Sequence, residues 1–399
     1  MRRRPARSLQ LRHRNRRVAR VGRCRCRADG YAPMTLVTDL DTPILVIDRA
    51  QMEENIRAMA NRMHTAGVAL RPHFKTSKMI EVAKLQIAAG AVGFTCATLA
   101  EVEALLDAGI TDLFWAHAPA TPAKRARIIA ANRHGRVSVG LDSRALVEAL
   151  AADAAVADVT IPVRVEVDTG LRRTGVDEAA ALDIAQLVAE LPGVELDGVY
   201  MHEGQLASVR GNRADLQNAG SDAAMQLVAA AERIRAAGIP VPVVSVGSTP
   251  GWDSAPFVLG VTEARPGTYV FFDANQWRLG SATVDQCALH LHATVISTVR
   301  EGEAAIDAGI KALSSDGSNR DTSFGIVVDV AGEPVDGLHF ERAYEEHGVI
   351  EGHVADGMRV GDRIRILPNH ACGVVNMWSR IALVDGDRVV DQWTPVARH

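Results

Sequence analysis

The chain has 399 residues, of which 47% are hydrophobic and 23% charged, with 33 glycines and 16 prolines. This composition is typical of globular proteins and excludes collagen-like and low-complexity classes. No run of 18 apolar residues occurs, so the sequence offers no membrane span. The five cysteines are too scattered for a disulfide framework, which favours a reducing, cytoplasmic setting; they are Cys24, Cys26, Cys96, Cys287 and Cys372.

The first 33 residues differ from the rest of the chain. They hold twelve arginines, no lysine and one acid, for a local charge of +11, whereas the remaining residues carry −15. Without apolar periodicity this stretch is expected to be disordered. A transit peptide and a nucleic-acid-binding arm are two interpretations, and an extension upstream of a start at Met34 is the preferred one. The acidic remainder argues against nucleic acid or an anionic membrane as a partner.

From Ile44 onward the sequence alternates between short apolar runs and helical patterns. The first helix is expected from about residue 50 to 65, where Met52, Ile56, Met59 and Met63 recur at spacings of three and four. Eight later runs read as strands separated mostly by single helices, which predicts a (β/α)₈ barrel over residues 34–280. These runs are 70–74, 92–97, 112–117, 136–142, 160–168, 195–202, 242–248 and 263–272.

Beyond about residue 280 the helical patterns disappear. Short β-like runs separated by turn signals predict a second, mainly β domain over residues 281–399. The runs are 289–299, 324–330, 363–367, 380–384 and 388–393.

Chemistry in such a barrel takes place at the carboxyl ends of the strands, and phosphate is often held after strands 7 and 8. Lys75 follows the first predicted strand. Of the small hydroxyl-bearing segments, Gly247-Ser248-Thr249 stands at the end of the seventh strand and Gly267-Thr268-Tyr269 lies in the eighth. A lysine at a strand end is commonly a solvated surface residue, and a Gly-Ser-Thr segment alone is commonly a simple turn. A lysine and two segments able to bind a phosphate, all at the same end of one barrel, together indicate a pyridoxal-phosphate site.

Eight short motifs occur in order from Asp41 to the end of the chain. They are Asp41-Thr42-Pro43, Arg71-Pro72-His73-Phe74-Lys75-Thr76, Glu166-Val167-Asp168-Thr169-Gly170, Arg173-Thr174-Gly175, Ser245-Val246-Gly247-Ser248-Thr249-Pro250, Arg265-Pro266-Gly267-Thr268-Tyr269, Glu346-His347-Gly348 and Pro368-Asn369-His370-Ala371-Cys372. Through these motifs the chain resembles the fold-type III pyridoxal-phosphate enzymes. Within them it is most similar to the D-threonine aldolase and D-serine dehydratase group, which includes D-threo-3-hydroxyaspartate dehydratase.

The resemblance implies a role for each matching residue. Lys75 is expected to bind the cofactor as a Schiff base, Arg173 to face its pyridine nitrogen, and His202 to pack against it. His370 and Cys372 are expected to bind a divalent metal, for which imidazole and thiolate favour Zn²⁺ over Mg²⁺, with Mn²⁺ as the alternative. Glu346 and His347 are expected to support that metal site. The phosphate is expected on Gly247, Ser248, Thr249, Gly267 and Tyr269.

The function expected from this resemblance is dehydration of β-hydroxy D-amino acids, such as D-serine or D-3-hydroxyaspartate, to a 2-oxo acid and ammonia. Retro-aldol cleavage to glycine and an aldehyde, with His202 as a candidate base, is the alternative. A racemase would need a second base, and Tyr344 is the only tyrosine after residue 285; a cofactor carrier would not need the β domain. The family also implies a homodimer with shared active sites, in which Lys75 and His370 come from different subunits.

Overall fold

The computed structural model describes residues 35–317 and 323–398, so the Arg-rich stretch over 1–33 and the expectations attached to it lie outside the described residues. By its contacts the chain divides after Met34, and the second unit, Thr35–His399, contains both predicted domains. In the described part of the chain, no helix has the length and apolar character needed to cross a membrane.

Eight parallel strands form the sheet of the first domain, which confirms the barrel prediction. Their spatial order is β2-β9-β8-β7-β6-β5-β4-β3, and a parallel bridge between His73 and Thr95 joins the two ends of the sheet. The strands are β2 (Ala69–Leu70), β3 (Phe94–Cys96), β4 (Asp112–Trp115), β5 (Arg136–Leu141), β6 (Ile161–Glu166), β7 (Val194–Tyr200), β8 (Val243–Val246) and β9 (Glu263–Ala264).

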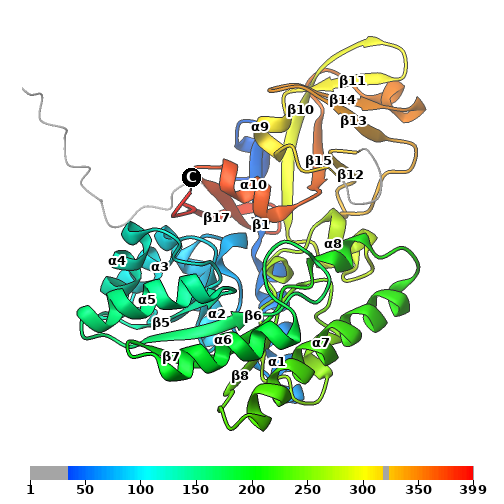
Figure 1. Cartoon of the computed structure of the whole chain (residues 1–399). Helices are drawn as coiled ribbons and strands as arrows, with labels where there is room; N and C mark the ends of the chain where they lie inside the picture. Colours follow the sequence, from blue (N-terminus) through cyan, green and yellow to red (C-terminus); the bar gives the residue numbers. More distant parts are fainter. Residues whose placement is uncertain (1–34, 318–322, 399) are drawn as a thin grey trace, which may run out of the picture. The chain divides into compact units, whose positions relative to one another are not determined.

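The helices connect these strands and cover the outside of the sheet (Figure 1). Most begin at a side-chain cap, such as Asp48, Thr98 or Asn212, which accepts a main-chain N–H of the first turn. In α1 the four methionine and isoleucine positions predicted from their spacing are all buried. The helices are α1 (Arg49–Ala66), α2 (Ile80–Ala88), α3 (Leu99–Asp107), α4 (Pro122–Ala131), α5 (Arg144–Val156), α6 (Glu178–Glu190), α7 (Arg213–Ala236) and α8 (Ala274–Arg278).

The last barrel strand is much shorter than expected. The run 263–272 forms a strand only over Glu263–Ala264, and residues Thr268–Val270 form a short 3-10 helix. Proline at position 266 has no N–H for a strand ladder, and Phe272 has a positive φ of 49°. The chain therefore leaves the sheet early and forms a loop across the barrel mouth.

The second domain is a nine-stranded sheet, as the mainly-β prediction required. Its main path is β13-β14-β11-β10-β1-β16-β17, and β15 pairs with both β10 and β12. The chain's first strand, β1 (Ile44–Asp48), belongs to this sheet, between β10 and β16. The other elements are β10 (Leu289–Arg300), β11 (Glu303–Ile306), α9 (Ile310–Leu313), β12 (Gly325–Val328), β13 (His339–Ala343), β14 (Gly348–Glu351), β15 (Arg363–Pro368), α10 (Ala371–Met377), β16 (Ile381–Asp385) and β17 (Arg388–Trp393).

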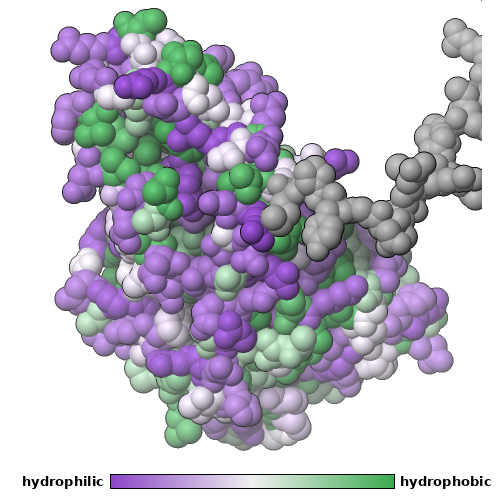
Figure 2. Space-filling view, turned by 180° about the vertical axis from the view of Figure 1, so that it is seen from behind, coloured by the Kyte–Doolittle hydropathy of each residue, from purple (hydrophilic) through white to green (hydrophobic). Residues whose placement is uncertain are grey.

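Hydrophobic residues form two large buried clusters, one in the barrel and one in the β domain. The surface is mixed: in Figure 2, hydrophobic side chains gather in the upper, β-domain part of the view, among hydrophilic ones.

A network of buried charges crosses the barrel interior. Arg164, which is 1% exposed, donates to Asp197 at 2.6 Å and to Glu263 at 2.5 Å. Glu263 also accepts from Arg71 at 2.7 Å and from the Ser245 hydroxyl at 2.6 Å. A buried charge is tolerated only where partners compensate its lost hydration, and here each carboxylate has at least two.

Candidate active site

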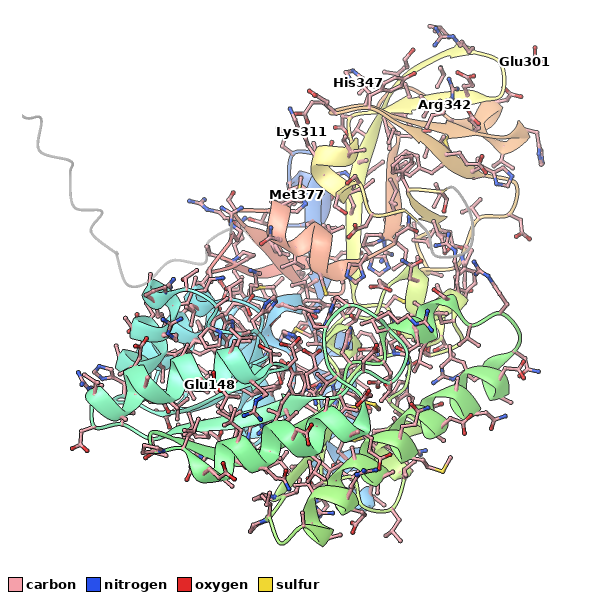
Figure 3. All side chains as sticks on the ribbon, in the orientation of Figure 1. Glu148, Glu301, Lys311, Arg342, His347 and Met377 are labelled. Carbon is pink, nitrogen blue, oxygen red and sulfur yellow. The ribbon has the colours of Figure 1, made fainter. Side chains whose placement is uncertain are left out.

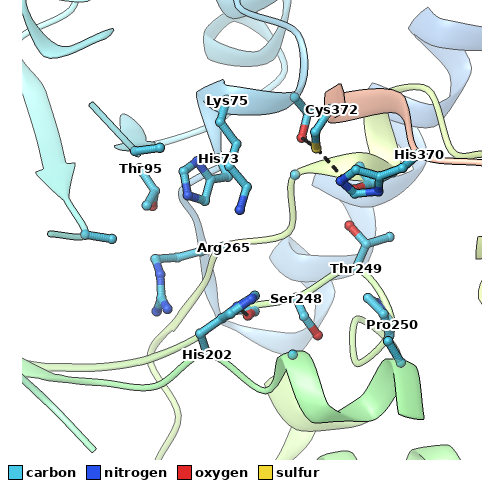
Figure 4. Close-up of a pocket in the computed structure, with 18 of the residues that line it drawn as sticks. His73, Lys75, Thr95, His202, Ser248, Thr249, Pro250, Arg265, His370 and Cys372 are labelled. Atoms are coloured by element: carbon cyan, nitrogen blue, oxygen red, sulfur yellow. Dashed lines mark hydrogen bonds between the residues drawn. The ribbon is translucent and has the colours of Figure 1, made fainter. Parts of the chain in front are cut away.

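A cavity of about 240 Å³ lies where the barrel strands end, and α10 of the β domain contributes to its wall. Nine of the ten residues predicted to hold the cofactor or the metal, or to act in catalysis, line it, and Figure 4 labels several of them. The lining residues among them are Lys75, Arg173, His202, Gly247, Ser248, Thr249, Gly267, His370 and Cys372.

Lys75 lies on a 3-10 helix, Phe74–Thr76, that follows β2, and its amine points into the cavity (Figure 4). His73 is the N-cap residue of this helix. Burial, aided by the charge of Lys75, lowers the pKa of His73 well below its usual range, so the imidazole is neutral. Its Nδ1 is buried and has no hydrogen-bond partner within the described residues. His73 thus offers the cavity a polar atom that a bound molecule can satisfy.

The two predicted phosphate loops lie side by side. The hydroxyl of Thr249 accepts the main-chain N–H of Tyr269 at 3.2 Å, which links the loop after β8 to the loop after β9. Neither loop has room for a side chain at its glycine, because a Cβ on Gly247 would lie 2.9 Å from the Arg265 guanidinium and one on Gly267 would lie 2.7 Å from the Thr76 hydroxyl. Small residues therefore let backbone amides and hydroxyls approach a phosphate.

A buried carboxylate stands behind the first of these loops. Glu203 is 1% exposed and accepts the Gly247 N–H at 3.1 Å and the Ser248 hydroxyl at 3.0 Å. Burial raises the pKa of Glu203. This carboxyl group holds the loop in shape from the side away from the solvent.

Tyr269 is the predicted site residue that does not line the cavity. Its ring is fully buried, and its hydroxyl accepts a hydrogen bond from Gln86 at 2.8 Å. Tyr269 therefore contributes to the loop only through its main chain.

Two guanidinium groups line the cavity at different depths. Arg173 is exposed, whereas Arg265 is 5% exposed and donates to the main-chain oxygen of Met201 at 2.5 Å and to the Ser245 hydroxyl. Burial lowers the pKa of Arg265 to about 10, so it stays charged at neutral pH. Arg265 was not predicted from the sequence as a site residue, although it begins the motif Arg265-Pro266-Gly267, because the strand there was expected to continue to residue 272.

His202 follows β7 and is held by the neighbouring loop. Its Nδ1 lies 2.7 Å from the main-chain oxygen of Gly247. Because a carbonyl oxygen only accepts, Nδ1 carries the proton and Nε2 keeps a lone pair. Burial, and then the charge of Lys75, lower the pKa of His202 to about 3, so the ring is neutral at ordinary pH.

His370 and Cys372 face the cavity from the start of α10 and hydrogen-bond to each other (Figure 4). The Cys372 sulfur also lies 3.1 Å from the hydroxyl of Thr76, the residue after Lys75. The thiolate of Cys372 raises the pKa of His370 to about 10. In return, His370 overcomes the effect of burial and lowers the pKa of Cys372 to about 7. The pair is thus arranged as a soft nitrogen and sulfur donor set.

Asp273 lies behind this pair and was missed in the sequence. It is fully buried, accepts the Ala371 N–H at 3.0 Å, and has a carboxylate oxygen 3.7 Å from His370 Nδ1. It also caps α8 by accepting the N–H of Gln276 at 2.9 Å. A carboxylate with these partners fixes the start of α10, and its charge acts on His370, which lies just beyond hydrogen-bond distance.

Two expectations about this region are wrong. The lysine and the His370–Cys372 pair were expected from different subunits, but within a single chain they line one cavity. Glu346 and His347 were expected to support the pair, but neither lines the cavity: Glu346 forms an ion pair with Lys311 at 3.1 Å, and His347 is exposed in the outer part of the β domain (Figure 3).

Comparisons with known proteins agree with this architecture. Residues 47–275 match the family described as alanine racemase, N-terminal domain, and residues 288–384 match the putative serine dehydratase domain. The chain is 39% identical to D-threo-3-hydroxyaspartate dehydratase of Delftia sp. (strain HT23), over 90% of this chain and 98% of that protein. It is 31% identical to D-threonine aldolase of Arthrobacter sp., over 90% and 93%.

Among solved structures, that of the Delftia dehydratase superposes with a TM-score of 0.85 at 37% identity, covering 90% of this chain and 98% of that chain. Alanine racemase of Corynebacterium glutamicum, at 22% identity and a TM-score of 0.61, shares the fold. The chain therefore belongs to the fold-type III pyridoxal-phosphate enzymes, in the group of D-serine dehydratase-like and D-threonine aldolase-like proteins.

Proposed function

We propose that this protein is a pyridoxal-phosphate- and metal-dependent lyase that removes water from β-hydroxy D-amino acids, yielding a 2-oxo acid and ammonia. The observation that carries the proposal is the meeting of Lys75 and the His370–Cys372 pair in one cavity. A substrate bound between them would present its α-hydrogen to the amine and its β-hydroxyl to the nitrogen–sulfur pair.

The cavity suits pyridoxal phosphate. The loops after β8 and β9 leave no space for a Cβ at their glycines, which is the cradle that a phosphate needs. Lys75 supplies the amine for covalent attachment. His73, which is half-buried, lines the cavity, and its Nδ1 has no hydrogen-bond partner in the described part of the chain.

The His370–Cys372 pair suits a soft divalent ion. Imidazole nitrogen and thiolate sulfur are typical zinc ligands, and within the described residues no third His, Cys, Asp or Glu joins them. Two protein ligands would leave positions for water and substrate. Solved structures of D-threo-3-hydroxyaspartate dehydratase include a histidine-to-alanine variant and a metal-free cysteine-to-alanine variant, at positions with the same two-residue spacing as His370 and Cys372.

When bound, pyridoxal phosphate supplies the electron sink for charge at Cα, and a divalent ion supplies a Lewis acid that improves the hydroxyl as a leaving group. The protein's own residues do the rest. The Lys75 amine is the base for the α-proton. Arg173, exposed at the cavity, is suited to the substrate carboxylate. Arg265, buried and held by two hydrogen bonds, replaces Arg173 as our candidate for the guanidinium beside the ring nitrogen.

Retro-aldol cleavage is the second candidate, and one observation favours it. His202 lines the cavity with an unprotonated Nε2 that can accept the β-hydroxyl proton, although its lowered pKa makes it a weak base. Racemisation has less support, because Tyr344 is 59% exposed and does not line the cavity.

The deciding experiment incubates the purified protein, loaded with pyridoxal phosphate, with D-threonine, D-serine and D-3-hydroxyaspartate, with and without a chelator. The dehydratase predicts a 2-oxo acid and ammonia, lost on chelation and restored by Zn²⁺ more effectively than by Mn²⁺. Glycine plus an aldehyde would identify an aldolase, and formation of the other enantiomer would identify a racemase. Absence of turnover would contradict all three.

A homodimer, which the resemblance implies, and a cytoplasmic location, which the scattered cysteines favour, remain predictions. Sedimentation of the purified protein tests the first, and fractionation of the cells that produce it tests the second.

A further inference from the structure

The β domain contains a second, larger cavity of about 810 Å³ that shares no lining residue with the candidate active site. It lies against the face of the sheet formed by β1, β10 and β15, and segments 327–338 and 354–358 supply another part of its lining. Nothing in the proposed lyase reaction uses this cavity.

Four nitrogen-bearing side chains line it from two paired strands. His290 and His292 alternate along β10, and Arg363 and Arg365 alternate along β15. In the antiparallel register, His292 faces Arg365 directly, so the two side chains project from the same face of the sheet. Both histidines are only 6% exposed. The sheet therefore presents two buried imidazoles and two guanidinium groups to one space.

This set has unused hydrogen-bonding capacity. Nδ1 of His292 and Nε of Arg365 are buried without a partner in the part of the chain that the structure describes. Arg365 donates to the main-chain oxygen of Val330, and Arg363 to those of Val37 and Leu40. Across residues 35–317 and 323–398, neither guanidinium forms an ion pair with a carboxylate. Asp48, Asp329 and Asp387 act on the charge of Arg365 from a distance, and a bound carboxylate would supply the direct ion pair that they do not form.

The imidazoles can act as neutral donors to such an anion. Burial lowers the pKa of His290 to about 3 and that of His292 to about 4, with the charge of Arg365 adding to the effect. A neutral imidazole carries one N–H, which can donate to an oxygen.

The carboxylates around the cavity do not make it a cation site. Asp48 caps α1 by accepting the N–H of Gln51 at 3.0 Å, and Asp329 accepts two main-chain amides at 2.8 and 2.9 Å. Asp362 likewise accepts the N–H of Arg359 at 2.7 Å, and Asp387 is the fourth carboxylate in the lining. No group of three or more potential metal ligands occurs in the described residues.

Much of the remaining lining is apolar. Val46, Val328, Val335, Leu338 and Met358 border the space. A ligand that fits both surfaces has one anionic end and a compact hydrocarbon body.

We propose that this cavity binds a small organic carboxylate with a branched or aromatic body, its carboxylate held by His292 and Arg365. The His292 imidazole and the Arg365 guanidinium donate to the two carboxylate oxygens, and the valine, leucine and methionine side chains bury the hydrocarbon. The site is independent of the lyase reaction.

The test measures binding of 4-methylpentanoate to the cofactor-loaded protein by calorimetry, with 4-methylpentanamide as the uncharged probe of the same shape. Binding of the acid at millimolar concentration or tighter, at least about tenfold stronger than the amide, is expected, since one charge-assisted contact is worth about that factor. Arg365→Gln should weaken the acid about tenfold and leave the amide unchanged. Arg300→Gln, at the exposed end of β10, is the matched control and should change neither.

Further outcomes separate this site from the active site. Binding of the acid should persist in Lys75→Ala, and its loss there would place the ligand in the barrel and overturn the proposal. Equal binding of acid and amide, or no binding of either by the wild-type protein, would also overturn it. These last comparisons need no variant, so they hold even if Arg365→Gln does not fold.

Discussion

The buried charges of the barrel interior give a prediction whose size follows from the structure. In Glu263→Gln, the carboxylate that accepts from Arg71, Arg164 and Ser245 becomes a neutral amide. The Glu263 side chain is 4% exposed and that of Arg164 is 1% exposed, so solvent cannot replace the lost charge. Breaking a buried ion pair on one side typically costs about 3–5 kcal/mol. We expect the lower end, about 3 kcal/mol, because Arg71 keeps Asp112 and Arg164 keeps Asp197.

The assay is urea unfolding of the wild type and the variant, each loaded with cofactor. Arg127→Gln is the control, because it removes a bidentate ion pair with Glu103 whose side chains are 46% and 51% exposed. An exposed pair is worth only about 0–1 kcal/mol. A loss below about 1 kcal/mol in Glu263→Gln would refute the view that this network holds the barrel interior together.

The pH dependence provides a second check. Burial alone would favour the neutral acid, but Arg164 and Arg71 outweigh it and hold the pKa of Glu263 well below its usual range. A carboxylate with a lowered folded-state pKa stabilises the protein above its unfolded pKa of about 4.3, and this stability is lost as the pH falls further. The difference between wild type and Glu263→Gln should therefore be largest at neutral pH and shrink below about pH 4.

Other predictions follow from single contacts. Tyr269→Phe should cost about 1 kcal/mol of stability without changing cofactor affinity, because its hydroxyl binds only Gln86 in the core, whereas Thr249→Val should weaken cofactor binding in an absorbance titration. Cys372→Ala should reduce bound zinc, measured by elemental analysis, and lower turnover at least about 100-fold. His290 and His292 have lowered folded-state pKa values of about 3 and 4, so the unfolded chain binds protons first and stability should fall as the pH drops from about 6.5. Replacing both histidines with glutamine should make the melting temperature depend less on pH below about 6.5. An unchanged dependence of the melting temperature on pH would contradict this account.

Much of the fold was predictable because it rests on local patterns. The spacing of Met52, Ile56, Met59 and Met63 defines one face of a helix, and that face is buried. Eight apolar runs separated mainly by helices specify parallel strands, since each crossover needs a helix. The strand ends then located Lys75 and the glycine loops, because parallel strands finish at the same edge.

The sequence also indicated the metal pair, for a different reason. His370 and Cys372 are two residues apart, so they stay close in any fold of that segment, and their donor atoms are those that zinc prefers. The contact between Cys372 and Thr76 could not be predicted from the sequence. The two residues are 296 positions apart, and their contact depends on how the β domain packs on the barrel.

Only the tertiary structure decided the direction of individual side chains at the barrel mouth. Tyr269 and Arg265 belong to one sequence motif, yet the Tyr269 side chain points into the core toward Gln86, whereas Arg265 lines the cavity. The loop after β9 has no periodic pattern of apolar residues. The motif alone therefore cannot show which of its side chains points into the cavity and which into the core. Likewise, β1 precedes the barrel in the chain but pairs in the β domain, between β10 and β16. Local periodicity determines which segments are strands, whereas pairing between distant segments is settled by the surfaces that the whole chain buries together.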